Sequence, residues 1–376
     1  MSFLDIIHRY ENFDAGNYCA SVTPARVERI LNRGRLDELD FLALLSPAAS
    51  SPHCLEMMAK RALDITKTHF GNVIFLFTPL YVSNICDNLC PYCSFAHQHK
   101  IKRRHLNINE VRREAELIAA TGLRHILMLT GESRKGAAVQ YLRDCVSVLK
   151  EFFSSIAIEV YPLDAREYAE LVSCGVDGLT IYQETYNKDI YTSLHKGGPK
   201  EDFEHRLLAP ERACEAGMRA VTVGPLLGLA PPLRDAWMAG LHARHILDRF
   251  PSVEVSCSFP RLRPQEGDFS PDFTVDDRTF VQYMTAFRIF MPSAGITVST
   301  RESASFRDSI LPLGPTKMSA GVSTSVGSGS GDATESQFEI ADSRSVGEMQ
   351  KNLLSRGFQP VVVDWNYILC REAVSS

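Results

Sequence analysis

Eight short apolar stretches alternate with longer amphipathic segments through most of this chain of 376 residues. A short apolar run rich in β-branched residues is typical of a strand. The strand candidates lie at residues 73–77, 125–129, 156–160, 178–182, 220–223, 253–256, 295–298 and 316–320. This alternation strongly limits the possible folds, because every strand needs a neighbour in a sheet and every connection has to cross that sheet.

Helix candidates follow the strands in turn, with apolar residues at helical spacing. They lie at residues 108–121, 139–153, 165–174, 201–216, 235–249, 276–290, 303–310 and 345–355. Strands that alternate with helices form parallel sheets. Eight units with right-handed crossovers and apolar strands predict the α/β class and a complete (β/α)8 TIM-type barrel.

The first seventy residues differ from the rest because they show helical patterns only. Thr23 followed by Pro24 is typical of a helix start, since threonine caps a helix and proline is accepted in its first turn. Residues 36–45 and 59–68 carry further helical patterns. We therefore predict an N-terminal helical cap over residues 1–70 and a barrel with a C-terminal tail over residues 71–376, a length that one α/β barrel can reach.

Charge and hydropathy favour a cytoplasmic protein that binds neither nucleic acid nor membrane. The net charge of −5 and the pI near 6.1 give no support for a nucleic-acid surface. The one basic run, residues 100–104, is interpreted as a solvated turn. The chain shows neither an N-terminal signal nor an apolar run long enough for a membrane span. Seven cysteines stand singly, as free thiols in a reducing compartment do.

Three cysteines, Cys86, Cys90 and Cys93, follow the first predicted strand in the spacing CxxxCxxC. Four cysteine thiolates fill the irons of a [4Fe–4S] cluster, whereas three leave one iron open for another ligand. In a barrel of this type the working groups lie at the carboxyl ends of the strands, which is where the triplet stands. The spacing therefore predicts a cluster that takes part in chemistry.

Zinc is the alternative reading of this triplet. His97 or His99 would supply a fourth ligand, which would make the protein a zinc-stabilised binding module. Zinc sites usually pair two CxxC units at a distance, and a second unit is missing here. A passive iron–sulfur electron carrier is the other non-enzymatic alternative.

The spacing, with Tyr92 before the third cysteine, resembles the signature of radical S-adenosylmethionine (SAM) enzymes. More narrowly, the chain resembles the tyrosine lyase family of thiamine biosynthesis, the 2-iminoacetate synthases, over residues 27 to 369. The segments that carry this resemblance lie in order at residues 44–50, 130–132, 182–186, 258–264, 299–303 and 364–365.

The resemblance implies two cofactors, a [4Fe–4S] cluster held by three cysteines and SAM bound to the open iron. It implies that an adenosyl radical removes a hydrogen atom from the amino group of L-tyrosine and that the Cα–Cβ bond then breaks. The products are 2-iminoacetate (dehydroglycine) and p-cresol. Thiazole synthase is the implied consumer of dehydroglycine, and a flavodoxin or a ferredoxin is the implied electron donor.

The resemblance also implies a group of cofactor-binding residues at the barrel rim. These are Tyr92, Gly131, Glu132, Glu159, Glu184, Arg206 and Gly224. Each has an ordinary structural alternative, which stays open at this point. The glycines can simply make turns, the carboxylates can cap a helix or pair with Arg206, and Tyr92 can be a buried ring without a ligand.

The carboxylate of an amino-acid substrate suits an arginine fork, which binds it through two charge-assisted hydrogen bonds. The resemblance assigns this task to Arg301 and assigns a contributing hydroxyl to Ser319. It places Tyr81 near the substrate amino group. Arg261, Arg263 and Arg307 are competing candidates, because each lies in or near a segment of the resemblance.

Two departures from the family pattern bear on the substrate. Residues 319–331 form a glycine–serine run without the usual proline and aromatic residue, and Tyr161 replaces a frequent glutamine. A lyase that acts on tryptophan or another aromatic amino acid therefore stays open. The tyrosine lyase of hydrogenase maturation carries a further cysteine-rich domain, and the solitary Cys370 argues against that class.

Overall fold

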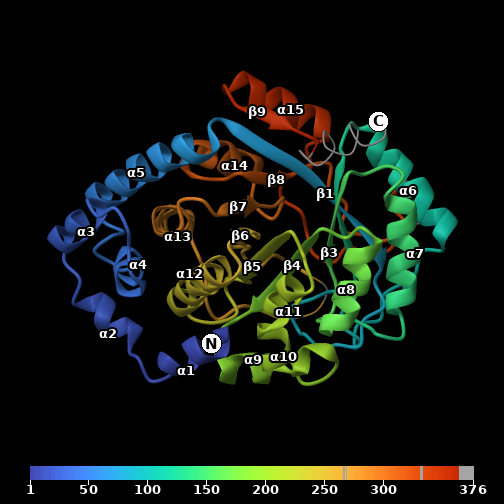
Figure 1. Cartoon of the computed structure of the whole chain (residues 1–376), viewed down its shortest axis with the longest axis horizontal. Helices are drawn as coiled ribbons and strands as arrows, with labels where there is room; N and C mark the ends of the chain where they lie inside the picture. Colours follow the sequence, from blue (N-terminus) through green and yellow to red (C-terminus); the bar gives the residue numbers. More distant parts are fainter. Residues whose placement is uncertain (266, 268, 331–332, 364–376) are drawn as a thin grey trace.

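The computed structural model describes residues 1–265, 267, 269–330 and 333–363 (Figure 1). Eight parallel strands occur in chain order around a closed barrel, because β1 pairs with both β8 and β2. The predicted complete barrel is confirmed. Its strands are β1 Val73–Ser83, β2 His125–Thr130, β3 Ser155–Glu159, β4 Gly178–Glu184, β5 Ala220–Pro225, β6 Glu254–Ser258, β7 Gly295–Val298 and β8 Lys317–Ser319.

Two features of the sheet were not predicted. Strand β1 continues to Ser83, beyond the predicted end at residue 77, and so reaches the rim of the barrel before the cysteine segment begins. A short additional strand, β9 (Gln359–Val361), pairs with the first residues of β1 outside the barrel. The longer β1 matters for the site, because it brings Tyr81 to the carboxyl end of β2.

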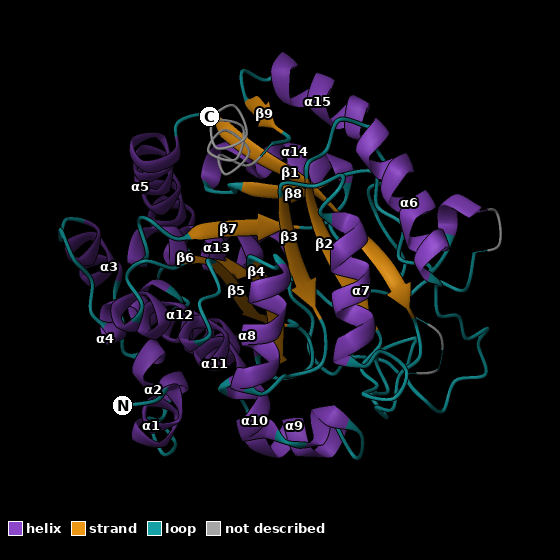
Figure 2. Cartoon of the chain, turned by 45° about the vertical axis from the view of Figure 1, so that its right-hand side comes forward, coloured by secondary structure: helices purple, strands orange, loops and turns teal. Residues whose placement is uncertain are grey.

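Helices surround the barrel, as Figure 2 shows. They are α6 Ile108–Ala120, α7 Val139–Leu149, α8 Ala165–Cys174, α9 Lys188–Leu194, α10 Phe203–Leu207, α11 Ala209–Glu215, α12 Pro232–Arg249, α13 Asp277–Phe290, α14 Ala304–Ile310 and α15 Val346–Ser355. The helix predicted over residues 201–216 is two helices, since Pro210 in the first turn of α11 cannot continue α10. Helix α9 was not predicted.

Five helices precede the barrel: α1 Phe3–Arg9, α2 Ala15–Ala20, α3 Pro24–Leu31, α4 Glu38–Leu44 and α5 Pro52–Phe70. Helices α1 and α2 were not predicted. Helix α5 starts earlier than residue 59, because Ser51 caps it and Pro52 occupies its first turn. The rings of Phe41 and Phe290 stack, and their centroids are 4.5 Å apart. Buried residues of this region and of the barrel form one continuous core, and the division at residue 70 stays a prediction.

The contact between α4 and α12 offers a test of how closely this N-terminal region packs. A Cβ atom added to Gly240 would lie 2.2 Å from Cε1 of Phe41. We expect Gly240→Ala to lower the free energy of unfolding by about 1–2 kcal/mol, because overpacking outweighs the gain in helix propensity. The measurement is chemical unfolding followed by circular dichroism.

Gly347→Ala in α15 is the matched control for this substitution. A Cβ atom there would meet nothing within 4 Å. We expect the free energy of unfolding of this variant to rise by roughly 0.5 kcal/mol. Equal stability of Gly240→Ala and the wild type would contradict the close packing of α4 on α12.

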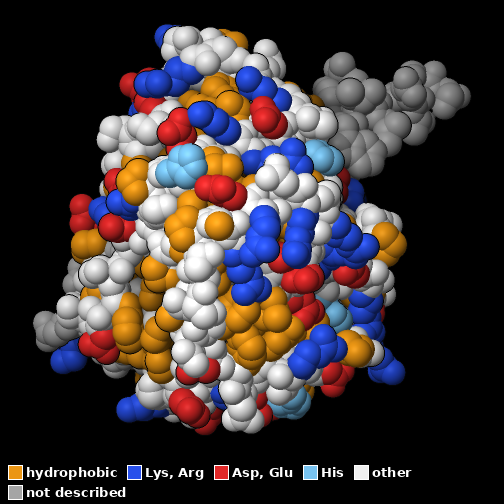
Figure 3. All heavy atoms as spheres, turned by 90° about the vertical axis from the view of Figure 1, so that its left-hand side faces the viewer, with side chains coloured by type: hydrophobic (Ala, Val, Ile, Leu, Met, Phe, Trp, Pro, Cys, Tyr) orange, Lys and Arg blue, Asp and Glu red, His pale blue; other side chains and the backbone are white. Residues whose placement is uncertain are grey.

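The surface formed by the N-terminal helices mixes charges of both signs with apolar side chains (Figure 3). Among the described residues, no helix combines the length and apolar content that a membrane span requires. The nine cysteines in the described part are all free thiols, and Cys370 lies outside it. Asp364 and Trp365, which contribute to the resemblance, also lie outside the described residues.

Candidate active site

A cavity opens at the carboxyl ends of the barrel strands. It is lined from the ends of β1, β2, β3, β4 and β8 and from the loops that follow β1 and β7. Twelve of the thirteen predicted site residues line it: Tyr81, Cys86, Cys90, Tyr92, Cys93, Gly131, Glu132, Glu159, Glu184, Arg206, Arg301 and Ser319. The exception is Gly224. A Cβ atom there would lie 1.9 Å from the carbonyl oxygen of Ser258, so this glycine allows two strand ends to approach closely.

The three cysteines of the triplet reach this one cavity from the loop after β1. Cys86 and Cys90 are buried, and Cys93 is partly exposed. A Cβ atom at Gly131 would lie 2.4 Å from the carbonyl oxygen of Ile85, so glycine is required where β2 passes under this loop. The N–H of Gly131 donates to the carbonyl of Ser83 at 2.8 Å.

Arg103 holds the cysteine loop in shape. Its guanidinium donates to the carbonyl oxygens of Asn84, Phe95, Ala96 and His99 at 2.7 to 3.1 Å. The interpretation of residues 100–104 as a solvated turn is therefore wrong for Arg103. One charged side chain satisfies four carbonyls that a loop without regular structure leaves unpaired.

The donor set fits a cluster better than a single zinc ion. His97 and His99 turn their Nδ1 atoms to the carbonyls of Cys86 and Ser94, and neither ring lines the cavity. Within the described part of the chain, no three His, Cys, Asp or Glu side chains surround a single-ion position. Thiolates that bind different irons of a cluster lie farther apart than ligands of one ion. Burial raises the pKa of the Cys86 thiol to about 12, so this thiol would have to release a proton in order to bind iron.

A buried group of four charges lies beside the cysteines. Arg206 Nη1 is 2.9 Å from Glu132 Oε1, and Lys200 Nζ pairs with Glu184. The second oxygen of Glu132 accepts a hydrogen bond from Asn88 Nδ2 at 3.1 Å. Burial alone would raise the pKa of Glu132, but Arg206 and Lys200 together bring it below its ordinary value. Two carboxylates and two cations thus face one cavity.

Glu184 has a strained backbone at this place. Its φ of 70° is the only positive value among the described residues other than glycine. The strand also changes register between Tyr182 and Glu184. Strain of this kind costs about 1–3 kcal/mol and is found mainly where function requires a particular side-chain position. Here the bend turns the Glu184 carboxylate toward Lys200 and Arg206.

Tyr92 lies next to both Cys90 and this charged group. Its hydroxyl is 2.5 Å from Nε2 of His195, and Lys200 Nζ lies 5.7 Å from its ring centroid. The ring is buried and packs with Cys90, Leu226 and Leu229. One face of the cavity next to the thiols is therefore aromatic and apolar.

Tyr81, Glu159, Arg301 and Ser319 also line the cavity. Ser319 Oγ accepts a hydrogen bond from the N–H of Thr300 at 3.1 Å. Burial, followed by the nearby Glu184, raises the pKa of Glu159 to about 7. Arg301 lies against the ring of Phe338, with Cζ 3.5 Å from the ring centroid. No carboxylate pairs with Arg301 in the described part of the chain, so its guanidinium is available to an anion.

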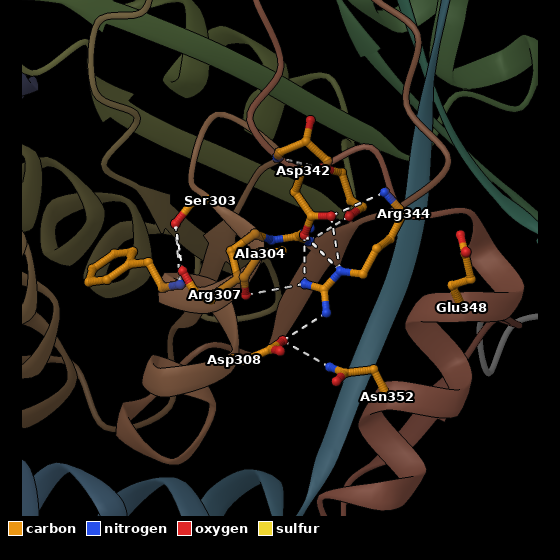
Figure 4. A network of polar contacts seen from close by, with 12 residues as sticks. Ser303, Ala304, Arg307, Asp308, Asp342, Arg344, Glu348 and Asn352 are labelled. Carbon is orange, nitrogen blue, oxygen red and sulfur yellow. Dashed lines mark hydrogen bonds and ion pairs between the residues drawn. The ribbon is translucent and has the colours of Figure 1, made fainter.

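Two competing arginines are occupied elsewhere. Arg307 is buried, pairs with Asp342 and donates to the carbonyl of Ser319 at 2.6 Å. Asp342 also binds Arg344, which reaches Asp308 and thereby joins α14 to the chain before α15 (Figure 4). Arg261 pairs with the buried Glu302 and with Asp277. The third competitor, Arg263, does not line the cavity.

Lys200, Gln337 and Phe338 are among the residues that line the cavity and were not predicted. Lys200 follows Gly-Gly-Pro, a sequence that is typical of a turn. A lysine in a loop of the fourth β/α unit could still have been considered as a site residue. Gln337 and Phe338 lie beyond the glycine–serine run, where the sequence shows no strand or helix pattern. Two departures from the family pattern were noted, the glycine–serine run and Tyr161. The run lines the cavity with Val322 and Thr324, whereas Tyr161 does not line it.

Comparisons with known proteins give matches over most of the chain. The model of the radical SAM superfamily matches residues 80–236, and that of the biotin and thiamin synthesis associated domain matches residues 258–359. The chain is 40% identical to 2-iminoacetate synthase of Escherichia coli, with 93% of each chain covered. The 2-iminoacetate synthase of Salmonella typhimurium is 39% identical over the same shares.

Solved structures are similar over most of the chain as well. The FeFe-hydrogenase maturase HydG from Carboxydothermus hydrogenoformans superposes with a TM-score of 0.84 at 29% identity, covering 97% of this chain and 84% of that one. Methylornithine synthase superposes with a TM-score of 0.72 at 21% identity, covering 89% and 97%, and shares the fold.

Proposed function

Because this chain belongs to the 2-iminoacetate synthase family of the radical SAM superfamily, we propose that it cleaves the Cα–Cβ bond of L-tyrosine to 2-iminoacetate and p-cresol. It is thus a radical SAM carbon–carbon lyase. The observation that carries the proposal is one cavity that is lined by three cysteines and by an arginine without a carboxylate partner in the described part of the chain. The product would serve the thiazole moiety of thiamine, in keeping with the second matching family model.

We assign the cluster to Cys86, Cys90 and Cys93, which leave one iron for SAM. The hydrogen bonds of Arg103 keep the loop of the triplet closed around that position. When bound, the cluster and SAM supply a 5′-deoxyadenosyl radical. The chain's own task is then to hold both partners and to keep water away.

The charged group beside the triplet suits the methionine end of SAM. Glu132, kept ionised by Arg206 and Lys200, is a partner for the ammonium group. Lys200 and Arg206 are partners for a carboxylate. Tyr92 and Leu226 offer an aromatic and apolar surface for the adenine. Because all four charges are already paired, SAM would exchange partners within the group rather than introduce isolated charges.

L-tyrosine suits the part of the cavity that Arg301, Ser319 and Tyr81 line. Arg301 would bind its carboxylate in a fork, with the Ser319 hydroxyl beside it. Tyr81, from the extended end of β1, would lie near the amino group. Glu159 is held partly protonated near neutral pH by its buried position, and it is suited to exchange a proton with the substrate.

The remaining partners follow from the chemistry. Reductive cleavage of SAM needs an electron, for which a flavodoxin or a ferredoxin is the expected donor. 2-Iminoacetate hydrolyses in water, so direct delivery to thiazole synthase is expected. Both partners and the free thiols suit the cytoplasm, and we propose that location.

Product analysis after anaerobic turnover tests the proposed substrate. The reconstituted protein is incubated with SAM, a reductant and either L-tyrosine or L-tryptophan. We expect p-cresol and glyoxylate, the hydrolysis product of 2-iminoacetate, from tyrosine. Indole products from tryptophan, with no p-cresol from tyrosine, would instead assign the chain to a tryptophan lyase.

A further inference from the structure

A short segment that follows the glycine–serine run lines the cavity with Gln337 and Phe338. The N–H of Gln337 donates to the carbonyl of Thr324 at 3.0 Å, and Thr324 Oγ1 donates to the carbonyl of Phe338 at 3.0 Å. The N–H of Ala341 donates to the carbonyl of Thr300 at 2.8 Å. Residues 337 and 338 are thereby fixed at the rim between the cysteine loop and Arg301.

The side chain of Gln337 uses both ends of its amide. Its Oε1 accepts a hydrogen bond from the hydroxyl of Tyr81 at 2.8 Å, and its Nε2 donates to Cys93 Sγ at 3.7 Å. The main-chain carbonyl oxygen of Gln337 accepts a hydrogen bond from the N–H of Ser94 at 3.4 Å. A single residue therefore contacts a cysteine of the triplet and the tyrosine at the end of β1.

We infer that Gln337 is a positioning residue that joins the cluster to the substrate side of the cavity, and that its amide N–H raises the reduction potential of the cluster. The inference rests on the proposed assignment of Cys93 as an iron ligand. A hydrogen bond to a ligand sulfur stabilises the reduced cluster, which carries one more negative charge than the oxidised cluster. The same amide holds the Tyr81 hydroxyl, so the contact with sulfur and the contact with the substrate side are made by one rigid group.

The chemistry of glutamine supports this role over simple filling of space. An apolar side chain would fill the same volume, but it would leave the Tyr81 hydroxyl without its acceptor. The pKa of Tyr81 is raised well above its ordinary value, mainly by burial, so this hydroxyl remains a donor. The amide must then turn its oxygen to Tyr81 and its N–H groups to the sulfur, which gives the contact with Cys93 a fixed polarity.

The test is the reduction midpoint of the cluster in the anaerobically reconstituted protein, measured by electron paramagnetic resonance without SAM or tyrosine. Gln337→Met removes both contacts at similar volume. Gln337→Glu keeps an acceptor for Tyr81 but replaces the donor to Cys93 with a negative charge. We expect a more negative midpoint in both variants, with the larger shift in Gln337→Glu. A midpoint equal to that of the wild type in Gln337→Met would overturn the inference.

Ser336→Ala is the matched control in the same segment. Its hydroxyl is exposed and contacts Ser325 Oγ at 3.1 Å, away from the cysteines. We expect the reduction midpoint and the iron content of this variant to equal those of the wild type. A midpoint shifted as far as that of Gln337→Met would overturn the inference, because any change in this segment would then shift the midpoint. Iron and sulfide analysis distinguishes a failure of the proposed function from a failure of the role inferred for Gln337. Wild-type protein that binds no cluster would contradict the proposed function, whereas full clusters with equal midpoints contradict only the role of Gln337.

Discussion

Cys90→Ala is expected to abolish the reductive cleavage of SAM altogether. Cys90 is buried at the centre of the triplet and packs between Tyr92 and the apolar residues Leu226 and Leu229. Alanine offers no ligand, and two thiolates cannot replace three around a cluster that must keep one iron open. The measurement is 5′-deoxyadenosine formed under anaerobic reduction, together with iron and sulfide per chain.

Cys174→Ala is the control for this experiment. Cys174 ends α8, is partly exposed and does not line the cavity. We expect full cluster content and wild-type formation of 5′-deoxyadenosine from this variant. Cleavage of SAM by the Cys90→Ala protein at the wild-type rate would remove the basis of the cluster assignment.

The barrel and the place of the triplet could be predicted from local signals. Each strand is a compact apolar run, and the carboxyl ends of parallel strands meet at one rim, so Cys86 and Glu132 had to lie at the same end of the barrel. What the strand pattern could not show was the exact end of β1. Six more residues extend it, and this extension is what carries Tyr81 into the cavity.

Pairing between distant residues could not be predicted from the sequence. The sequence alone does not distinguish the roles of Arg261, Arg301 and Arg307. Only the fold shows that Arg261 forms an ion pair with Glu302 and Arg307 with Asp342. The same holds for Lys200, whose partners come from three different segments. Such contacts depend on long-range packing, which a single sequence does not reveal.

Irregular segments hid two further contributions. Gln337 and Phe338 carry no periodic pattern, yet hydrogen bonds to Thr324 and the ion pair of Arg307 with Asp342 keep their segment in place. Figure 4 shows how this ion pair belongs to a network that continues to α15. Contacts with Thr324 and Arg307 thus support this wall of the cavity, although nothing in its composition indicates it.

Arg301→Met is expected to lower kcat/KM for L-tyrosine by about 10²–10³-fold. Removal of one partner of a buried, hydrogen-bonded charge pair costs about 2–5 kcal/mol, and each 1.4 kcal/mol is a factor of ten. Besides the ring of Phe338, the guanidinium of Arg301 has no charged partner in the described part of the chain. The expected loss of kcat/KM therefore reflects the lost contact with the substrate carboxylate. Arg301→Lys keeps the charge but loses the planar fork, and a smaller loss is expected.

Two measurements separate substrate binding from damage to the fold or to the cluster. In the Arg301→Met protein, reductive cleavage of SAM without tyrosine should persist, because in the described part of the chain Arg301 forms no ion pair with the charged group that suits SAM. Arg261→Met should instead lower the unfolding temperature, since it leaves the buried Glu302 without its partner. If Arg301→Met and the wild type had equal kcat/KM for tyrosine, another group would have to bind the carboxylate. Lys200 and Arg206 would then be the next candidates, because they also line the cavity.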